Sequence, residues 1–378
     1  MLERRILTAE VVYNGLGTPR ADGAVVVQHT GAEEQIVFIG DLATARRNFP
    51  DALEERVGFA ISPPPVNAHT HLDLSTMTFT PGDYEAFIAE VIATSQAGRR
   101  GSDAAEKGRV ELRRYGTTTV GDIVTRAEVM HFLLSSDLHG VAYWEVLGPD
   151  PADAERLFDE TVDKLRAFKA QERPGGMRVG LSPHSPHTVS APLLQKLARL
   201  AQQNKLPLQI HVAESALELA FHRDGSAFHS LQTLADWQPS GLTPVGYLEK
   251  LGVLDAAPTL VHMIHVTEDD VRAVQKAGCV VVHCPRSNVA LNCGRFPWEL
   301  YAKHGVTVAF GTDGRGSSPT LSIEDEVRAA RELHGDKANP LALVWSAVKG
   351  GYRALGMQPP KILRGDAFSR FHVWRERA

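Results

Sequence analysis

The feature that most constrains this chain is a repeated alternation between short apolar runs and amphipathic stretches of helical length. Strands that alternate with helices pair in parallel, so the alternation predicts an α/β fold with a parallel sheet. About eight such units are typical of a (β/α)8 barrel of the TIM type, which can take up most of a 378-residue chain as one domain. The predicted strands are residues 58–61, 117–124, 140–146, 178–182, 207–212, 259–266, 278–283 and 305–312. The clearest predicted helices are residues 152–171, 191–204, 268–277 and 324–333.

The two ends of the chain do not follow this alternation. Residues 6–39 contain short strand-like runs separated by turn signals at Asn14-Gly15 and Asp22-Gly23. Residues 368–375 read as one more strand after a long helix at 340–355. We therefore predict a small β-sandwich domain built from residues 1–60 and 362–378, and a barrel formed by residues 61–361.

Composition excludes several classes of protein. The net charge of -5 and a pI near 6.3 argue against a general nucleic-acid binder. No apolar run approaches the roughly 20 residues of a membrane span, and the start of the chain lacks the apolar core of a signal peptide, so we expect a cytoplasmic protein without membrane partners. The three cysteines, Cys279, Cys284 and Cys293, are too few for a disulfide framework and are expected to be packing residues.

Polar side chains gather at the carboxyl ends of the predicted strands, where barrel enzymes assemble their active sites. His69 and His71 follow the first predicted strand and alternate, so both imidazoles face the same way and could share a metal ion. One H-x-H pair could arise by chance among 16 histidines, but residues that converge on one barrel mouth are best explained as a site. The other strand ends carry His184, His211, Glu214, His262, His283 and Asp313.

This combination resembles the amidohydrolase superfamily, and within it the metal-dependent deaminases related to cytosine, guanine and S-adenosylhomocysteine deaminases. The resemblance covers residues 66–321. It implies that four side chains hold one divalent metal ion, with zinc as the first candidate and iron as the second. Relatives with two metals bridge them with a lysine on the fourth strand, whereas this strand ends in Ser182-Pro183-His184, which favours a mononuclear site. The implied ligands are His69, His71, His211 and Asp313.

The resemblance also implies the chemistry. A metal ion lowers the pKa of its bound water to about 7, and the resulting hydroxide would attack the amino-bearing ring carbon and release ammonia. Glu214 would pass a proton from this water to the ring nitrogen, His262 would hydrogen-bond the water, and Asp313 would be both ligand and second proton acceptor. His265 could either hydrogen-bond a residue of the site or have a purely structural role, and both interpretations stay open. Glu218 is expected on the solvated face of a helix.

Other residues point to the substrate. His184 matches a family position that contacts the bound base, and Glu145 is a candidate pocket residue. Residues 311–322 look most like the branch that deaminates 6-aminodeoxyfutalosine, an adenine-bearing precursor of menaquinone. Arg286 and Arg315 could meet the benzoate carboxylate of that substrate, since guanidinium suits carboxylate recognition, although Arg286 and Glu145 could equally form ion pairs. The role of His187 stays open.

The best expectation is therefore a metal-dependent aminohydrolase that acts on a small nucleoside-like or purine-like substrate. One alternative is another hydrolysis on the same scaffold, such as removal of chlorine from a triazine, cleavage of a cyclic amide or action on an S-adenosylhomocysteine-type substrate. A second alternative is a non-catalytic scaffold, which would normally have lost ligands. The residues do not indicate whether the chain forms a homo-oligomer.

Overall fold

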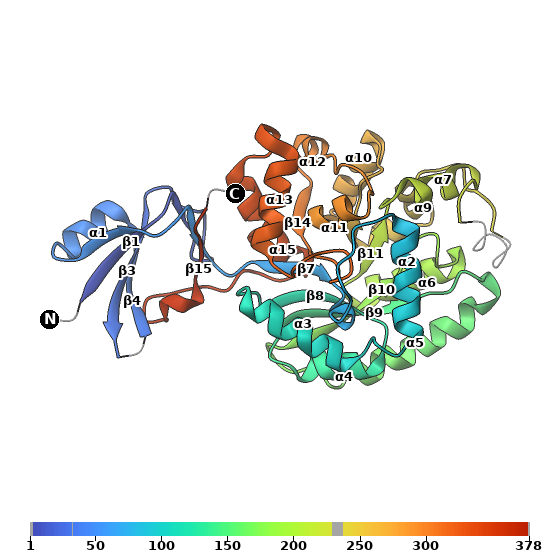
Figure 1. The fold of residues 1–378 in the computed structure, drawn as a ribbon, viewed down its shortest axis with the longest axis horizontal. Coiled ribbons are helices and arrows are strands. Elements are labelled where there is room, and N and C mark those ends of the chain that lie inside the picture. Colours follow the sequence, from blue (N-terminus) through green and yellow to red (C-terminus); the bar gives the residue numbers. More distant parts are fainter. Residues whose placement is uncertain (1–2, 32, 229–236, 377–378) are drawn as a thin grey trace. The chain divides into compact units, whose positions relative to one another are not determined.

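The computed structural model describes residues 3–31, 33–228 and 237–376, and these form two compact units. One unit comprises Val66–Met357, and the other comprises Met1–Pro65 together with Gln358–Ala378 (Figure 1). The break before the larger unit therefore falls after the proline run Pro63-Pro64-Pro65, later than the expected break after Ala60. Within the described residues, no helix is both long enough and apolar enough to cross a membrane.

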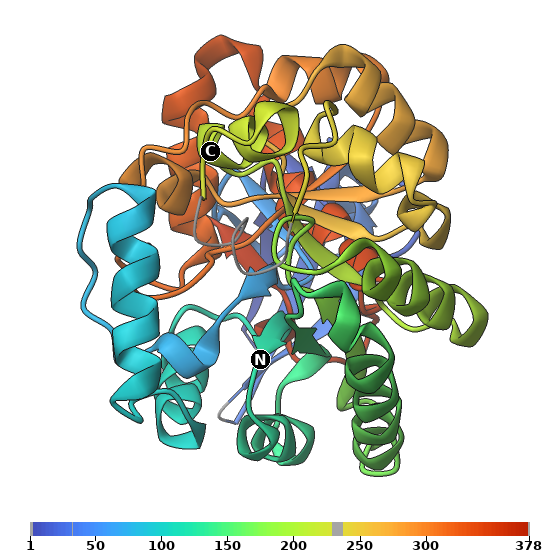
Figure 2. The ribbon, with the colours of Figure 1, turned by 90° about the vertical axis from the view of Figure 1, so that its right-hand side faces the viewer.

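The larger unit contains eight parallel strands in two sheets. The first sheet has the order β10-β9-β8-β7 and the second the order β11-β12-β13-β14. Single parallel bridges, Leu181 with Leu208 and Thr70 with Asp313, connect residues at the two borders between these sheets. Figure 2 shows the helices of this unit arranged around its strands. The strands are β7 (Val66–Thr70), β8 (Thr119–Val124), β9 (His139–Val146), β10 (Met177–Pro183), β11 (Gln209–Val212), β12 (Thr259–His262), β13 (Val280–His283) and β14 (Thr307–Phe310).

The helices of this unit turn an apolar face toward the strands. In α6 the buried residues Leu193, Leu194, Leu197, Ala198 and Ala201 follow helical spacing. A capping box of Thr267 and Asp270 begins α10, and Gly278 ends it, so both ends match the prediction. The main helices are α2 (Tyr84–Gln96), α3 (Ser102–Arg114), α4 (Ala127–Ser135), α5 (Ala154–Lys169), α6 (Ala191–Asn204), α7 (Ala216–Asp224), α9 (Pro244–Lys250), α10 (Glu268–Ala277), α11 (Pro285–Ala290), α12 (Trp298–His304), α13 (Ile323–His334), α14 (Pro340–Trp345) and α15 (Gly351–Ala354).

The smaller unit joins the two ends of the chain. Its sheets have the orders β4-β3-β1-β5 and β15-β6-β2. Side chains from both sheets share one core, which includes Leu7 and Val25 from the first sheet and Val12 and Ile61 from the second. The elements are β1 (Arg4–Thr8), β2 (Val11–Val12), β3 (Gly23–Thr30), β4 (Glu33–Asp41), α1 (Leu42–Asn48), β5 (Leu53–Arg56), β6 (Ala60–Ser62) and β15 (His372–Trp374).

Two local predictions were wrong. The run 58–61 is not the first barrel strand, because β6 (Ala60–Ser62) pairs with β2 and β15 in the smaller unit, and the first barrel strand is β7. A short apolar run does not reveal which sheet will bury it. The predicted helix at 340–355 is present as a continuous helical segment from Pro340 to Ala354, which contains a π-helical turn at Ser346–Gly350. The expected strand at 368–375 begins as a 3-10 turn, Phe368–Arg370, and only three residues form a strand.

The three cysteines are free and buried, as predicted for packing residues.

Candidate metal and catalytic site

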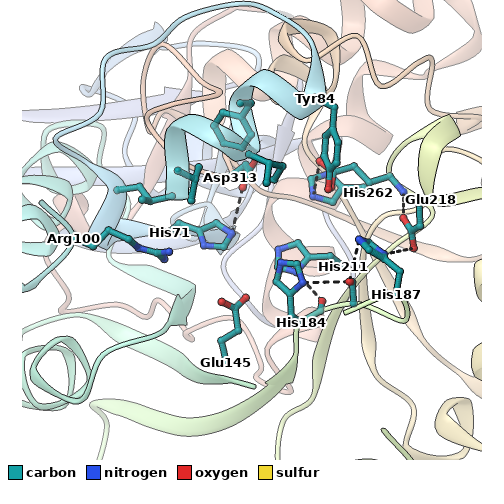
Figure 3. A pocket seen from close by; sticks show the side chains of 16 residues that line it. His71, Tyr84, Arg100, Glu145, His184, His187, His211, Glu218, His262 and Asp313 are labelled. Atoms are coloured by element: carbon teal, nitrogen blue, oxygen red, sulfur yellow. Dashed lines mark hydrogen bonds and ion pairs between the residues drawn. The ribbon is translucent and has the colours of Figure 1, made fainter. Parts of the chain in front are cut away.

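A pocket lies where the carboxyl ends of the strands meet, and helix α2 adds apolar side chains to its wall. Residues at or within a few positions of the carboxyl ends of β7, β10, β11 and β14 line it together with Glu145 of β9 and His262 of β12, and most of them are buried (Figure 3). The 16 lining residues are His71, Leu74, Tyr84, Phe87, Ile88, Val91, Arg100, Glu145, His184, Ser185, His187, His211, Glu214, Glu218, His262 and Asp313.

The structure brings the four expected metal ligands together. The Nε2 atoms of His69 and His71 each lie 3.4 Å from Oδ1 of Asp313. The ring of His211 lies 4.8 Å from that of His69, centroid to centroid. Ligand atoms of His69, His71 and Asp313 all lie within 4.8 Å of one another. These distances allow one cation to contact side chains at the ends of three strands, β7, β11 and β14.

Neighbouring side chains orient these ligands. Nδ1 of His69 hydrogen-bonds Oε1 of Gln209 at 2.7 Å, and Nδ1 of His211 hydrogen-bonds the carbonyl of His184 at 3.0 Å. Both rings thereby keep Nε2 for another partner, and Nε2 of His69 is buried without a hydrogen bond in the described part of the chain. Hydrogen bonds of this kind, made by the second ring nitrogen, are typical of metal-binding histidines.

Asp313 is held in the same way by two hydroxyl groups. Ser287 and Ser317 donate hydrogen bonds of 2.7 Å and 2.8 Å to Oδ2, which leaves Oδ1 facing His69 and His71. Ser287 belongs to the Ser287-Asn288 pair of α11, and Asn288 hydrogen-bonds Nδ1 of His262 at 3.0 Å. The pair therefore acts on the site through the two residues that it positions.

The charges of the cluster suit a divalent cation. Burial lowers the pKa of His71, His211 and His262, which favours the neutral imidazole, the form that binds metal. Burial alone would raise the pKa of Asp313, but the hydrogen bond with His69 and the neighbouring histidines hold it well below the ordinary range. Three imidazoles and one carboxylate, those of His69, His71, His211 and Asp313, are a donor set that zinc accepts with a position left open for water.

Glu214 lies on the side of the cluster formed by β11 and β12. Its Oε1 is 3.4 Å from Nε2 of His262, and its carboxylate hydrogen-bonds the hydroxyl group of Tyr84. Burial, reinforced by the charges of Asp313 and Glu218, raises the pKa of Glu214 to about 8. A carboxyl group with a pKa near neutrality can both hold and release a proton at physiological pH, as a general acid-base catalyst must.

Backbone strain is concentrated at the same strand ends. Ala213, His262, Met263 and Asp313 have positive φ angles of 54, 71, 51 and 58 degrees. Residues other than glycine rarely adopt this left-handed conformation, and it costs free energy unless the surroundings impose it. The turns after β11, β12 and β14 are therefore held in conformations that aim side chains into the pocket.

Two of the expected substrate residues line the pocket. Nδ1 of His184 hydrogen-bonds the hydroxyl group of Thr188 at 2.7 Å, which orients the ring. Glu145 has one buried carboxylate oxygen without a hydrogen bond within the described residues. Burial raises the pKa of Glu145 to about 7, although the nearby charge of Arg100 opposes the shift.

Arg286 and Arg315, expected to contact the substrate, do not line this pocket. Nε of Arg286 donates to Oε1 of the buried Glu326 at 2.7 Å, so the ion-pair interpretation is the one that the structure shows. Nε of Arg315 lies 3.2 Å from Oε2 of Glu111, and its guanidinium also donates to the carbonyl of Ser318 at 3.0 Å. Each guanidinium group is paired with a carboxylate that lies far away in the sequence.

Several pocket residues were not predicted. Glu218 is not on a solvated face: it is 2% exposed, and its Oε2 accepts a hydrogen bond of 2.9 Å from the backbone N–H of Glu214. Arg100 pairs with Asp73, which follows the H-x-H motif by two residues and could have indicated a cationic partner. No local signal indicates Tyr84.

His265 hydrogen-bonds the carbonyl of Cys293 at 2.7 Å and takes the structural role.

Fold and site together define a class of protein, and comparison with known proteins agrees. The sequence profile of the amidohydrolase family matches residues 60–361, so the chain belongs to the amidohydrolase family. This confirms the resemblance inferred from the residues and the α/β fold of the TIM-barrel type.

Among the members of this family, the chain is similar to several deaminases. Aminodeoxyfutalosine deaminase from Deinococcus radiodurans is 44% identical over 383 aligned residues, which cover 98% of this chain and 90% of the relative. A 5-methylthioadenosine/S-adenosylhomocysteine deaminase from Halobacterium salinarum is 29% identical, with 90% and 78% covered. The crystal structure of Helicobacter pylori aminofutalosine deaminase in complex with methylthio-coformycin superimposes with a TM-score of 0.75 at 22% identity, covering 96% of this chain and 91% of that one.

Proposed function

We propose that this chain is a metal-dependent aminohydrolase that deaminates aminodeoxyfutalosine and thereby serves menaquinone biosynthesis. The observation that carries the proposal is the intact site: four clustered metal-ligand side chains stand beside a buried carboxyl group, Glu214, whose pKa is raised toward neutrality. The 44% identity to aminodeoxyfutalosine deaminase over 98% of the chain supports the choice of substrate.

Zinc is the cation that we propose, with His69, His71, His211 and Asp313 as its ligands. The orphaned Nε2 of His69 and the hydrogen bonds that fix the other ring nitrogens fit such an ion. When bound, the cation would supply the Lewis acidity that makes a water molecule nucleophilic at neutral pH.

Protein side chains then transfer the protons. The oxygen of water bonds to the ring carbon that carries the amino group, and Glu214 moves a proton from that water to the adjacent ring nitrogen. His262, fixed by Asn288, and Asp313, fixed by Ser287 and Ser317, would hydrogen-bond the attacking oxygen. The remaining proton of that water passes to the amino group, the C–N bond breaks, ammonia leaves, and a ring carbonyl remains.

The substrate screen that tests this function measures ammonia release from 6-aminodeoxyfutalosine, adenosine, S-adenosylhomocysteine, cytosine and guanine. We expect the highest kcat/KM for 6-aminodeoxyfutalosine and no turnover of cytosine. The Glu214→Gln variant is the control for contaminating deaminases. A higher kcat/KM for another aminopurine would replace the proposed substrate, and no ammonia from any compound would favour the non-catalytic scaffold.

Arg100 is our proposed partner for the substrate carboxylate, in place of Arg286 and Arg315. It is the only lysine or arginine among the described residues that line the pocket. Its guanidinium makes two hydrogen bonds to Asp73, of 2.9 Å and 3.1 Å, which hold it in place while it still reaches the pocket. A fixed guanidinium recognises carboxylates well.

The variant Arg100→Gln should therefore discriminate between substrates. A hydrogen bond to a charged group contributes about 1.5–3 kcal/mol, so we expect kcat/KM for 6-aminodeoxyfutalosine to fall at least about 10-fold more than kcat/KM for 5'-deoxyadenosine, which lacks a carboxylate. Steady-state kinetics on both substrates measure this ratio. Arg315→Gln is the matched control and should leave the ratio unchanged. An unchanged ratio in Arg100→Gln would remove Arg100 from substrate recognition.

The finer structural predictions are part of the same proposal. We propose that the eight parallel strands close into one (β/α)8 barrel, and that the two sheets of the smaller unit pack as a β-sandwich. The bridges at both borders of the larger sheets and the core shared by the two smaller ones support this. Location in the cytoplasm stays a prediction from the sequence.

A further inference from the structure

A second cluster of ligand-type side chains lies beside the pocket, and the proposed reaction uses none of them. His187 follows β10, while Glu218 and His222 lie on α7, one helical turn apart and therefore on one face of that helix. Ligand atoms of the three residues lie within 4.8 Å of one another. Nδ1 of His187 is 3.7 Å from Oε1 of Glu218. All three side chains are buried.

Several atoms of this cluster lack a hydrogen bond, although Nδ1 of His187 and Oε1 of Glu218 lie at ion-pair distance. Nδ1 of His187, Oε1 of Glu218 and both ring nitrogens of His222 are buried and have no hydrogen-bond partner among the residues that the structure describes. Buried polar atoms are nearly always paired, because leaving one unpaired costs its full desolvation free energy. Four such atoms in one place point to a missing binding partner.

The side chains are also fixed in position. Oε2 of Glu218 accepts the backbone N–H of Glu214 at 2.9 Å, which directs Oε1 toward the histidines. The ring of His187 stacks on Phe228 with centroids 5.1 Å apart and planes at 8 degrees. The ring of His222 contacts that of Tyr247, at 5.0 Å. Figure 3 shows His187 and Glu218 facing each other at the edge of the pocket.

We propose that His187, Glu218 and His222 bind a second divalent cation, and that this cation is zinc. Two imidazoles and one carboxylate are a ligand set that zinc adopts with a fourth position open, whereas calcium and magnesium require mostly oxygen ligands. Since His187 and Glu218 also line the pocket, this cation would lie beside the space where substrate binds. The cation joins α7 to the loop after β10, and the backbone of Glu214 is anchored to one of its ligands.

The alternative is a plain ion pair between His187 and Glu218. That pair satisfies the charge of Glu218 but leaves both nitrogens of His222 unpaired, so it explains only part of the cluster. The two interpretations differ in the number of metal ions that one chain binds.

The experiment counts metal ions and does not depend on deaminase activity. The full chain is stripped with a chelator, dialysed against zinc and analysed by elemental mass spectrometry. We expect two equivalents of zinc in the wild type and one in His222→Gln. His334→Gln, which changes a buried histidine outside both clusters, is the matched control and should retain two. Replacement by cobalt should give visible absorption bands from both sites, and His222→Gln should lose one set.

The outcomes separate this proposal from the proposed function. One equivalent in the wild type overturns the second site and leaves the deaminase site untouched. Two equivalents retained in both His222→Gln and His187→Gln also overturn it, and the second variant decides the matter if the first does not fold. Two equivalents in the wild type and one in either variant support it, whichever substrate the enzyme accepts.

Discussion

Replacing Glu214 by glutamine is expected to lower kcat by about 10²–10⁴-fold, the usual contribution of a general acid-base residue. Glutamine has nearly the same shape but cannot take up or release the proton that deamination requires. Glu214 is not among the proposed metal ligands, so the variant should retain as much zinc as the wild type. Steady-state kinetics with 6-aminodeoxyfutalosine and elemental analysis of the same preparation measure both quantities.

The control for this variant is Glu249→Gln, which changes an exposed glutamate and should leave both kcat and zinc content at wild-type values. Loss of zinc from Glu214→Gln would make Glu214 a ligand or a structural support. A decrease in kcat of less than tenfold with zinc retained would exclude it as the proton carrier and direct attention to His262 and Asp313.

Replacing Asp313 by asparagine is expected to impair both zinc retention and turnover. The carboxylate is the only negatively charged member of the proposed ligand set, and the amide removes that charge while keeping the size of the side chain. Loss of a group that merely orients a ligand already weakens metal binding about 10–100-fold, so we expect at least about 100-fold weaker binding here. Zinc content after dialysis at buffered free zinc concentrations measures the affinity.

Ser317→Ala is the matched variant for Asp313. It removes one hydrogen bond, of 2.8 Å, to Oδ2 but leaves the carboxylate in place, so its loss of zinc affinity should be smaller than that of Asp313→Asn. Equal losses in the two variants would show that the position of the carboxylate matters more than its charge. Wild-type zinc content in Asp313→Asn would contradict its assignment as a ligand.

The central residues of the site could be predicted because their signals are local. His69 and His71 alternate at the end of one strand, and His211, His262 and Asp313 each follow or end another parallel strand. Carboxyl ends of parallel strands in a barrel share one face, so a pattern repeated along the chain already implies convergence in space. The same reasoning predicted α6 and α10 with their observed ends, since helical periodicity and caps are also local properties.

Side chains whose role depends on a distant partner could not be assigned in this way. Arg286 and Arg315 have the right chemistry for a carboxylate, but they pair with Glu326 and Glu111 and do not line the pocket. Glu218 has the sequence position of a solvated helix residue, yet the packing of α7 buries it. Tyr84 and Arg100 come from the segment after β7, and nothing in their neighbourhood along the chain indicates contact with the pocket.

The amino-acid sequence by itself determined the α/β class, the family and the strand ends that carry Glu214 and the proposed metal ligands, because period, capping and motif spacing act over a few residues. Only the tertiary structure decided which charged groups line the pocket and which distant groups they pair with. It also brought His187 together with Glu218 and His222 from different elements. The physical reason is that burial and ion pairing depend on groups far apart in the chain, whose distances are set by the packing of the whole unit.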